Sequence, residues 1–178
     1  QVSAPFSDDF ESAQDQWTGG GQWTLLDGTG VDDSNAWWYR GTDGDYADGT
    51  ANFGGLTSPP IDIGMGGFYL RFKYRYETEN QHRWWDQRWV QISVDGGPFT
   101  NVYQLTEDPL IPELQLTTWL NSPAMDLSDY AGHVIRVRFM LTTLDTALNA
   151  FDGWGIDEFS ITSPAPPACS DLRQDDTP

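Results

Sequence analysis

Residues 68–76 read Phe-Tyr-Leu-Arg-Phe-Lys-Tyr-Arg-Tyr, and apolar or aromatic side chains alternate with others along the whole stretch. Successive side chains of a β-strand point to opposite faces. One face of this strand is therefore apolar and aromatic, and the other carries Arg71, Lys73 and Arg75. Strict two-residue alternation is typical of an antiparallel sheet with one face on a core and the other in water.

A second stretch, residues 133–141, repeats the pattern, with aliphatic and aromatic residues opposite Arg136 and Arg138. Each stretch follows a Ser-Pro bend and an Asp-containing turn, at residues 56–63 and 120–127. The chain thus contains two matched halves, and these predict two sheets that face each other.

The rest of the chain fits the same class. Residues 89–105 form a plausible β-hairpin around Asp95-Gly96-Gly97-Pro98, and no window has a convincing 3.6-residue period. About ten strands without β-α-β alternation predict an all-β protein, an antiparallel β-sandwich. We predict a single domain over residues 1–162 and a Pro-rich tail or linker over residues 163–178.

Composition excludes several function classes. The formal net charge is -18, from 27 acidic against nine basic residues. Nucleic-acid binding needs clustered Lys and Arg, and adhesion to an anionic membrane is disfavoured for the same reason. No apolar stretch is long enough to span a bilayer. The single cysteine, Cys169, excludes an internal disulfide and a cysteine-based zinc site.

Asp157 stands in the last predicted strand, residues 152–161. Phe159 and Ile161 look like core residues, so alternation predicts that Asp157 lies on the core-facing side. A carboxylate there is costly unless it is hydrogen-bonded or bound to a metal. Asp157 therefore either caps a loop by accepting backbone N–H bonds or is a calcium ligand.

Six motifs in a fixed order span most of the chain. They are Asp8-Asp9-Phe10-Glu11-Ser12, Ala36-Trp37-Trp38-Tyr39, residues 56–62, residues 88–97, Ser122-Pro123 with Tyr130-Ala131-Gly132, and residues 152–158. Together they resemble the MAM-like jelly-roll domains appended to secreted bacterial proteases of the immune inhibitor A type and to other surface proteins. The resemblance covers about residues 6–162. It implies a jelly roll, MAM-like or galactose-binding-like, that is secreted and extracellular or at the cell surface.

The resemblance also implies a structural calcium ion, held by carboxylates of the first and last strands. The matching positions are Glu11 and Asp157, and Asp9 is a near neighbour of Glu11. Asp32 and Asp33 lie in an early acidic loop that could close the cage. Such an ion would join the first strand to the last without a catalytic role.

The sequence contains few catalytic constellations, although its many acidic residues leave a carboxylate pair for glycoside hydrolysis open. His82 and His133 stand in no His-Glu-x-x-His arrangement, and no Gly-x-Ser-x-Gly motif occurs. The one cysteine lies in the tail, which makes a Cys-His nucleophile pair a poor hypothesis. We therefore predict that the chain is not an enzyme.

Aromatic side chains are the candidate ligand-binding residues. Trp84 and Trp85 follow Arg83 in a polar loop, and Trp37 and Trp38 lie between acidic loops. Exposed aromatic rings beside polar groups stack on sugars or anchor a protein partner. In the alternative interpretation, one of Trp37 and Trp38 is buried and the Trp84–Trp85 pair covers an edge of the sandwich.

The sequence as a whole predicts a secreted, non-catalytic β-sandwich with structural calcium that recognises glycans or cell-surface material. Two alternatives stay open: a self-assembling extracellular subunit of a fibre or surface layer, and an accessory domain of a secreted protease. The expected partner is a glycan, a protein surface or another copy of the chain. Nucleic acid and membrane insertion are not expected.

Overall fold

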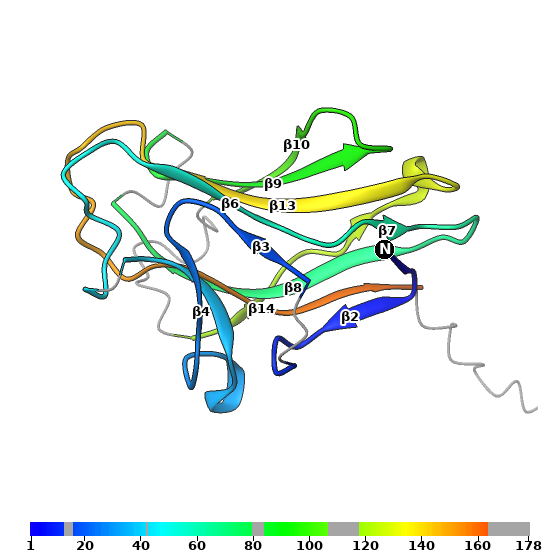
Figure 1. The fold of residues 1–178 in the computed structure, drawn as a ribbon, viewed down its shortest axis with the longest axis horizontal. Helices are drawn as coiled ribbons and strands as arrows, with labels where there is room; N and C mark the ends of the chain where they lie inside the picture. The colour runs from blue at the N-terminus through cyan, green and yellow to red at the C-terminus, as the bar shows by residue number, and fades with distance from the viewer. Residues whose placement is uncertain (13–15, 42, 80–83, 107–117, 164–178) are drawn as a thin grey trace, which may run out of the picture.

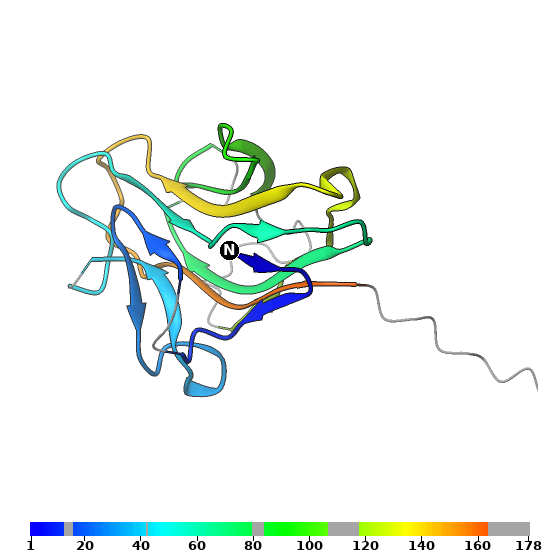
Figure 2. The ribbon, with the colours of Figure 1, turned by 45° about the vertical axis from the view of Figure 1, so that its right-hand side comes forward.

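The computed structural model describes residues 1–12, 16–41, 43–79, 84–106 and 118–163. Within these ranges two seven-stranded sheets face each other, and the only helices are two 3-10 turns, η1 (Val31–Asp33) and η2 (Ser128–Tyr130). The two layers are seen in Figures 1 and 2. The prediction of an all-β, antiparallel β-sandwich is confirmed. None of the described residues belongs to a helix long and apolar enough to cross a membrane.

Sheet A is built around β13, which pairs with β9 along one edge and with β6 and β7 along the other. The described strand pairs are antiparallel except β1 with β7. The strands of sheet A are β1 (Val2–Ser3), β3 (Thr18–Gly19), β6 (Phe53–Thr57), β7 (Ile61–Asp62), β9 (Gln87–Val94), β10 (Thr100–Leu105) and β13 (Val134–Thr142).

Sheet B is built around β8 and β14, which pair with each other. The N-terminal segment contributes to both sheets, because β1 lies beside β7 while β2 lies beside β14 (Figure 2). The strands of sheet B are β2 (Phe6–Asp8), β4 (Trp23–Leu26), β5 (Ala36–Tyr39), β8 (Tyr69–Glu77), β11 (Leu120–Asn121), β12 (Met125–Asp126) and β14 (Gly153–Thr162).

The long strands of the two matched halves, β8 and β13, lie in opposite sheets, and each Ser-Pro bend lies in the sheet of the other half's long strand. Ser58 of the first half donates its N–H to the Val137 carbonyl, and its Oγ accepts from the Val137 N–H, both at 2.9 Å. Ser122 of the second half makes the same pair of bonds with Phe72, at 2.8 and 3.0 Å. Each bend therefore docks on the long strand of the other half.

Aromatic rings fill the space between the sheets. Phe139 of sheet A contacts Phe72, Trp154 and Phe159 of sheet B, with ring centroids 4.7 to 6.3 Å apart. Edge-to-face contacts of this kind add to the free energy gained by burying the rings. The apolar faces of the alternating strands β8 and β13 thus meet in the core, as their periodicity predicts.

A β-bulge in β14 overturns the predicted orientation of Asp157. The register with β8 shifts by one residue between Asp157 and Ser160, and Glu158 has a φ of 45°. The bulge lets Ile156 before it and Phe159 after it both face the core. Asp157 lies opposite Lys73 and so points out of the sandwich, not toward the core.

Some predicted features lie outside the described residues. They are His82, Arg83 and most of the tail (residues 164–178, with Cys169). The domain boundary near residue 162 therefore stays a prediction.

Candidate functional site

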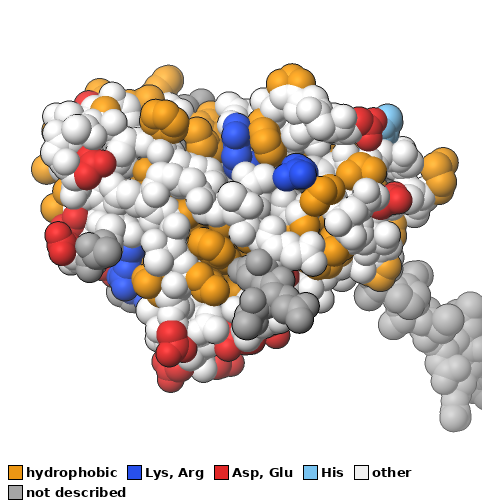
Figure 3. Space-filling model, viewed as in Figure 1, with side chains coloured by type: hydrophobic (Ala, Val, Ile, Leu, Met, Phe, Trp, Pro, Cys, Tyr) orange, Lys and Arg blue, Asp and Glu red, His pale blue; other side chains and the backbone are white. Residues whose placement is uncertain are grey.

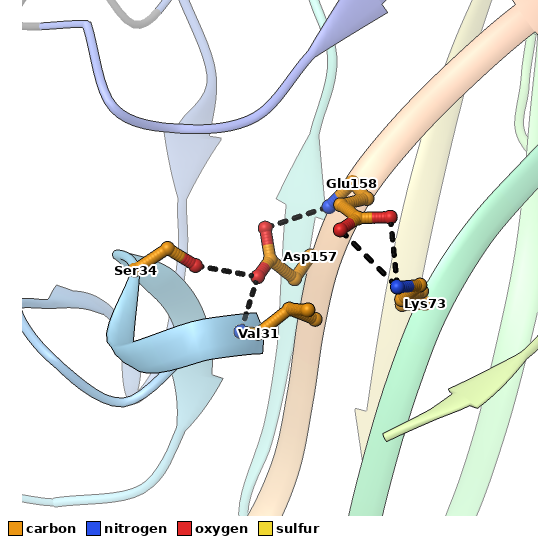
Figure 4. Close-up of polar contacts among 5 residues, drawn as sticks. All are labelled: Val31, Ser34, Lys73, Asp157 and Glu158. Atoms are coloured by element: carbon orange, nitrogen blue, oxygen red, sulfur yellow. Dashed lines mark hydrogen bonds and ion pairs between the residues drawn. The ribbon is translucent and has the colours of Figure 1, made fainter.

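Asp157 holds the loop between β4 and β5 (Figure 4). Its Oδ2 accepts hydrogen bonds from Val31 N at 2.8 Å and Ser34 Oγ at 3.1 Å, and its Oδ1 accepts from Glu158 N at 2.6 Å. The loop covers the carboxyl group so well that Asp157 is 1% exposed. Burial raises the pKa of Asp157, while the hydrogen bonds oppose that rise. These contacts are those of the loop-capping interpretation.

Glu11 holds the same loop from the N-terminal side. Its Oε1 accepts from Asn35 N at 2.5 Å, next to the residues that Asp157 binds. Asn35 Oδ1 is buried and has no hydrogen-bond partner. Carboxylate and amide oxygens are ligands that calcium takes in proteins. Glu11, Asn35 and Asp157 therefore offer a donor set of the right chemistry for the calcium ion that the resemblance implies.

The other predicted calcium ligands lie at the surface. Asp9 accepts a hydrogen bond from Glu11 N at 3.2 Å, and Asp32 and Asp33 are exposed. In the part of the chain that the structure describes, no three His, Cys, Asp or Glu side chains group to hold a metal. A calcium shell at Glu11 and Asp157 would thus need amide and backbone oxygens.

A pocket of about 340 Å³ opens on the outer side of sheet B, between the β4–β5 loop and β8. We call it the indole pocket. Trp38 of β5 and Trp119, which directly precedes β11, supply its aromatic lining. The other lining residues are Gly28, Thr29, Gly30, Asp33, Arg40, Arg75 and Asp152.

The two indoles pack edge-to-face, with ring centroids 5.8 Å apart at 71°. They lie on Gly155 of β14, where an added Cβ would be 2.8 Å from an atom of each ring, so a larger residue would displace them. Arg40 and Arg75 place their guanidinium carbons 5.2 and 5.5 Å from the Trp38 ring. The pocket thus combines aromatic surface with hydrogen-bond donors.

Two charged residues of the pocket form an ion pair with each other. Arg75 Nη2 lies 3.5 Å from Asp152 Oδ2, and both side chains are partly exposed. Asp33 adds a second carboxylate to the lining. A ligand rich in hydroxyl groups, which both donate and accept, would find partners of both kinds here.

The predicted ligand-binding residues are not brought together. Trp38 lines the indole pocket but is only 2% exposed, whereas Trp37 is half-buried against the core. The expectation that one of the two is buried is confirmed. Trp84 and Trp85 are 67% and 42% exposed, and neither lines the indole pocket.

Four pocket residues are not predicted from the sequence: Trp119, Arg40, Arg75 and Asp152. The alternation of β8 predicts only that Arg75 lies on a solvated strand face. Trp119 carries one signal, since it stands directly before the second Ser-Pro bend, but nothing in the sequence pairs it with Trp38.

A larger pocket, of about 490 Å³, lies between β9–β10 and the segment around η2. Its lining contains Ile92, Tyr103, Met125 and Tyr130, but neither tryptophan nor a basic residue. It therefore lacks the combination of indole rings and guanidinium donors found in the indole pocket.

The chain has a formal net charge of -18. On the face shown in Figure 3, acidic side chains gather along the lower edge, where Figure 1 places the β4–β5 loop, and Lys and Arg side chains are few. Nucleic-acid binding needs a basic patch, and the expectation that this chain binds no nucleic acid stays a prediction.

No family model and no curated protein matches the sequence. Solved structures of carbohydrate-binding modules do match the fold. TmCBM61, solved in complex with β-1,4-galactotriose, is 14% identical with a TM-score of 0.53, over 84% of this chain and 89% of that one. A xylan-binding domain from CBM22 is 15% identical with a TM-score of 0.52, over 89% and 93%.

The CBM22-1 xylan-binding domain of Paenibacillus barcinonensis Xyn10C is 13% identical with a TM-score of 0.51, over 90% of this chain and 95% of that one. At such low identity the similarity establishes the fold alone. The expected jelly-roll β-sandwich is therefore confirmed. The narrower link to MAM-like, protease-appended domains stays a prediction.

Proposed function

We propose that this chain is an extracellular, non-catalytic module that recognises glycans at the indole pocket. The observation that carries the proposal is the Trp38–Trp119 pair with two guanidinium groups beside it, in one hollow of sheet B. The volume of about 340 Å³ lies within the usual range for ligand pockets, about 300–1,000 Å³.

The aromatic and charged lining residues divide the binding of a sugar between them in this proposal. Trp119 is half-buried and supplies the accessible ring face on which a sugar stacks, whereas the nearly buried Trp38 supports it. Arg40 and Arg75 donate hydrogen bonds to sugar hydroxyls. Asp152 holds Arg75 in place, and Asp33 accepts from the ligand.

The structures with the same fold suggest which glycans to try first. TmCBM61 was solved with a β-1,4-galactotriose, and the CBM22 domains are described as xylan-binding. Short β-1,4-linked galacto- and xylo-oligosaccharides are neutral, so the acidic surface of this chain does not repel them.

Replacing Trp119 with alanine is expected to weaken binding of these oligosaccharides about tenfold or more, because an aromatic anchor is worth 1.4 kcal/mol or more. Isothermal titration calorimetry with each sugar measures the change. Trp84→Ala is the matched control, since it removes an equally large but exposed ring outside the pocket. Loss of binding in Trp84→Ala with normal binding in Trp119→Ala would move the site to the loop after β8.

The calcium ion is a structural part of the proposal. When bound, it would neutralise Glu11 and Asp157 and fix the β4–β5 loop, which supplies Gly28, Thr29 and Gly30 to the indole pocket. A bound ion would thus order one wall of the pocket.

Two alternatives remain as proposals. A self-assembling subunit is favoured by the N-terminal segment, which spans both sheets through β1 and β2 and could be exchanged between copies. An accessory domain of a secreted protease rests on the MAM-like resemblance. Large particles in light scattering would favour the first, and a protease domain on the same gene would favour the second.

A further inference from the structure

The described parts of three loops meet at one end of the sandwich, at the left of Figure 1. They follow β5, β8 and β13, and hydrogen bonds join them. Asn52 donates its Nδ2–H to the Tyr46 carbonyl at 2.9 Å, and Thr143 N–H donates to the Asn52 carbonyl at 3.0 Å. Tyr46 in turn donates its hydroxyl proton to Asp86 at 2.5 Å. We call this region the loop end.

Asp86 is fully buried at the loop end. Its Oδ2 accepts from Tyr46 and, at 2.9 Å, from Glu79 N, so the carboxyl group lies against the backbone of Glu79. Its second oxygen, Oδ1, is buried and has no hydrogen-bond partner. A buried carboxylate oxygen without a donor or a cation is unfavourable.

Two further oxygen atoms share this condition. Glu79 Oε2 is buried without a hydrogen-bond partner, and so is Oδ1 of Asn149, a residue that is 4% exposed. The amide nitrogen of Asn149 donates a hydrogen bond to the Asp145 carbonyl at 3.2 Å, whereas its amide oxygen accepts none. The loop end therefore contains three buried oxygen atoms that accept no hydrogen bond and could bind a cation.

The charges of the loop end point the same way. The carboxylates of Glu79, Asp86 and Asp145 interact electrostatically with one another, and the Arg88 guanidinium interacts with Asp86. Arg88 directs Nη1 to Thr78 Oγ1 and to the Asp86 carbonyl at 2.8 Å, and Nη2 to the Leu105 carbonyl at 3.3 Å. Burial, then repulsion from Asp86 and Asp145, raises the pKa of Glu79.

We propose that the loop end binds one divalent cation, calcium by its ligand chemistry, through Glu79, Asp86 and Asn149. All three would bind through hard oxygen atoms, and two negative charges match the charge of the ion. The described residues contain no trio of acidic, His or Cys side chains spaced for a metal, so the amide of Asn149 and backbone oxygens or waters complete the shell.

This site is separate from the calcium ion proposed at Glu11 and Asp157, which lies at the β4–β5 loop. Its effect is to fix the loops after β8 and β13 relative to each other. Trp84 and Leu148, both exposed, stand on those loops. A bound ion would therefore also fix the apolar surface that these side chains present.

The test is calcium titration of the full chain, first stripped with a chelator and followed by calorimetry. Glu79→Gln keeps the size of the side chain and removes its charge, and is expected to weaken one calcium site about tenfold or more. Glu77→Gln is the matched control, because it removes the same charge from a half-buried position two residues earlier. It is expected to leave calcium affinity and stoichiometry unchanged.

Near-ultraviolet circular dichroism in chelator checks that both variants fold, and Asp86→Asn supplies a second test of the same site. Equal calcium stoichiometry and affinity in wild type, Glu79→Gln and Asp86→Asn would overturn the proposal and assign the three oxygen atoms to ordered water. Loss of all calcium binding in Asp157→Asn alone would overturn it too.

Discussion

Asp157→Asn is expected to lower the free energy of unfolding by about 2–4 kcal/mol, because a carboxylate that accepts three hydrogen bonds loses its charge and one acceptor. Oδ2 accepts from Val31 and Ser34, and Oδ1 accepts from Glu158. In either orientation the new amide group directs its own N–H at a backbone N–H. The variant therefore cannot restore all three bonds.

Urea unfolding followed by tryptophan fluorescence measures this loss. The matched control is Glu158→Gln, the next residue in the same bulge, which makes only a partly exposed ion pair with Lys73 at 3.1 Å. That variant is expected to change the free energy of unfolding by less than about 1 kcal/mol. A loss in Asp157→Asn as small as the one expected for Glu158→Gln, less than about 1 kcal/mol, would show that the loop contacts of Asp157 are dispensable.

Thermal unfolding of wild type and the Asp157→Asn variant tests whether calcium binds. If calcium binds the folded chain, wild type melts at a higher temperature in millimolar calcium than in excess chelator. Asp157→Asn should remove the part of this difference that belongs to the β4–β5 loop, and Glu79→Gln the part that belongs to the loop end. The same melting temperature for wild type in calcium and in chelator would contradict both proposed calcium sites.

Arg88→Met is expected to lower the free energy of unfolding by roughly 3–5 kcal/mol, the range for removing one partner of a buried charge network. Arg88 is fully buried, and its guanidinium carbon lies 3.9 Å from the centroid of the Tyr76 ring. Without Arg88, the backbone carbonyls of Asp86 and Leu105 lose the hydrogen bonds that its guanidinium donates. The Asp86 carboxylate also loses the positive charge that offsets its repulsion from Asp145.

The same urea titration gives the measurement, and Arg136→Met is its control. Arg136 is exposed on β13, so its replacement is expected to stay within about 0.5 kcal/mol of wild type. A loss of less than about 1 kcal/mol in Arg88→Met would mean that the buried guanidinium contributes little beyond its volume.

The fold was predictable because it rests on two-residue alternation. The faces of β8 and β13 follow directly from their sequences, and the Ser-Pro bends mark the two halves. The orientation of Asp157 was not predictable, because the bulge at Asp157–Glu158 adds one residue to β14 and reverses the alternation after it. Composition carries no signal for such an insertion.

The candidate site was predictable only in part. Trp38 stands out as an aromatic residue among acidic loops, but its neighbours come from β8, β14 and the segment before β11. Only the strand order brings Arg75, Trp119 and Gly155 to the same place. The buried position of Asp86 and Arg88 was equally hidden, because both belong to a polar stretch that resembles a solvated loop.

Because each Ser-Pro bend binds the long strand of the other half, a chain cut between the two halves would separate each long strand from its bend. The bend at Ser58 completes β13, and the bend at Ser122 completes β8, although each belongs to the opposite half. A fragment that ended before residue 107 would keep β8 but lack the Ser122 bend that covers it, and the fragment beginning at residue 118 would lack the Ser58 bend in the same way. Neither piece has both a long strand and the bend that binds it, so each half depends on the other for the hydrogen bonds that complete its long strand.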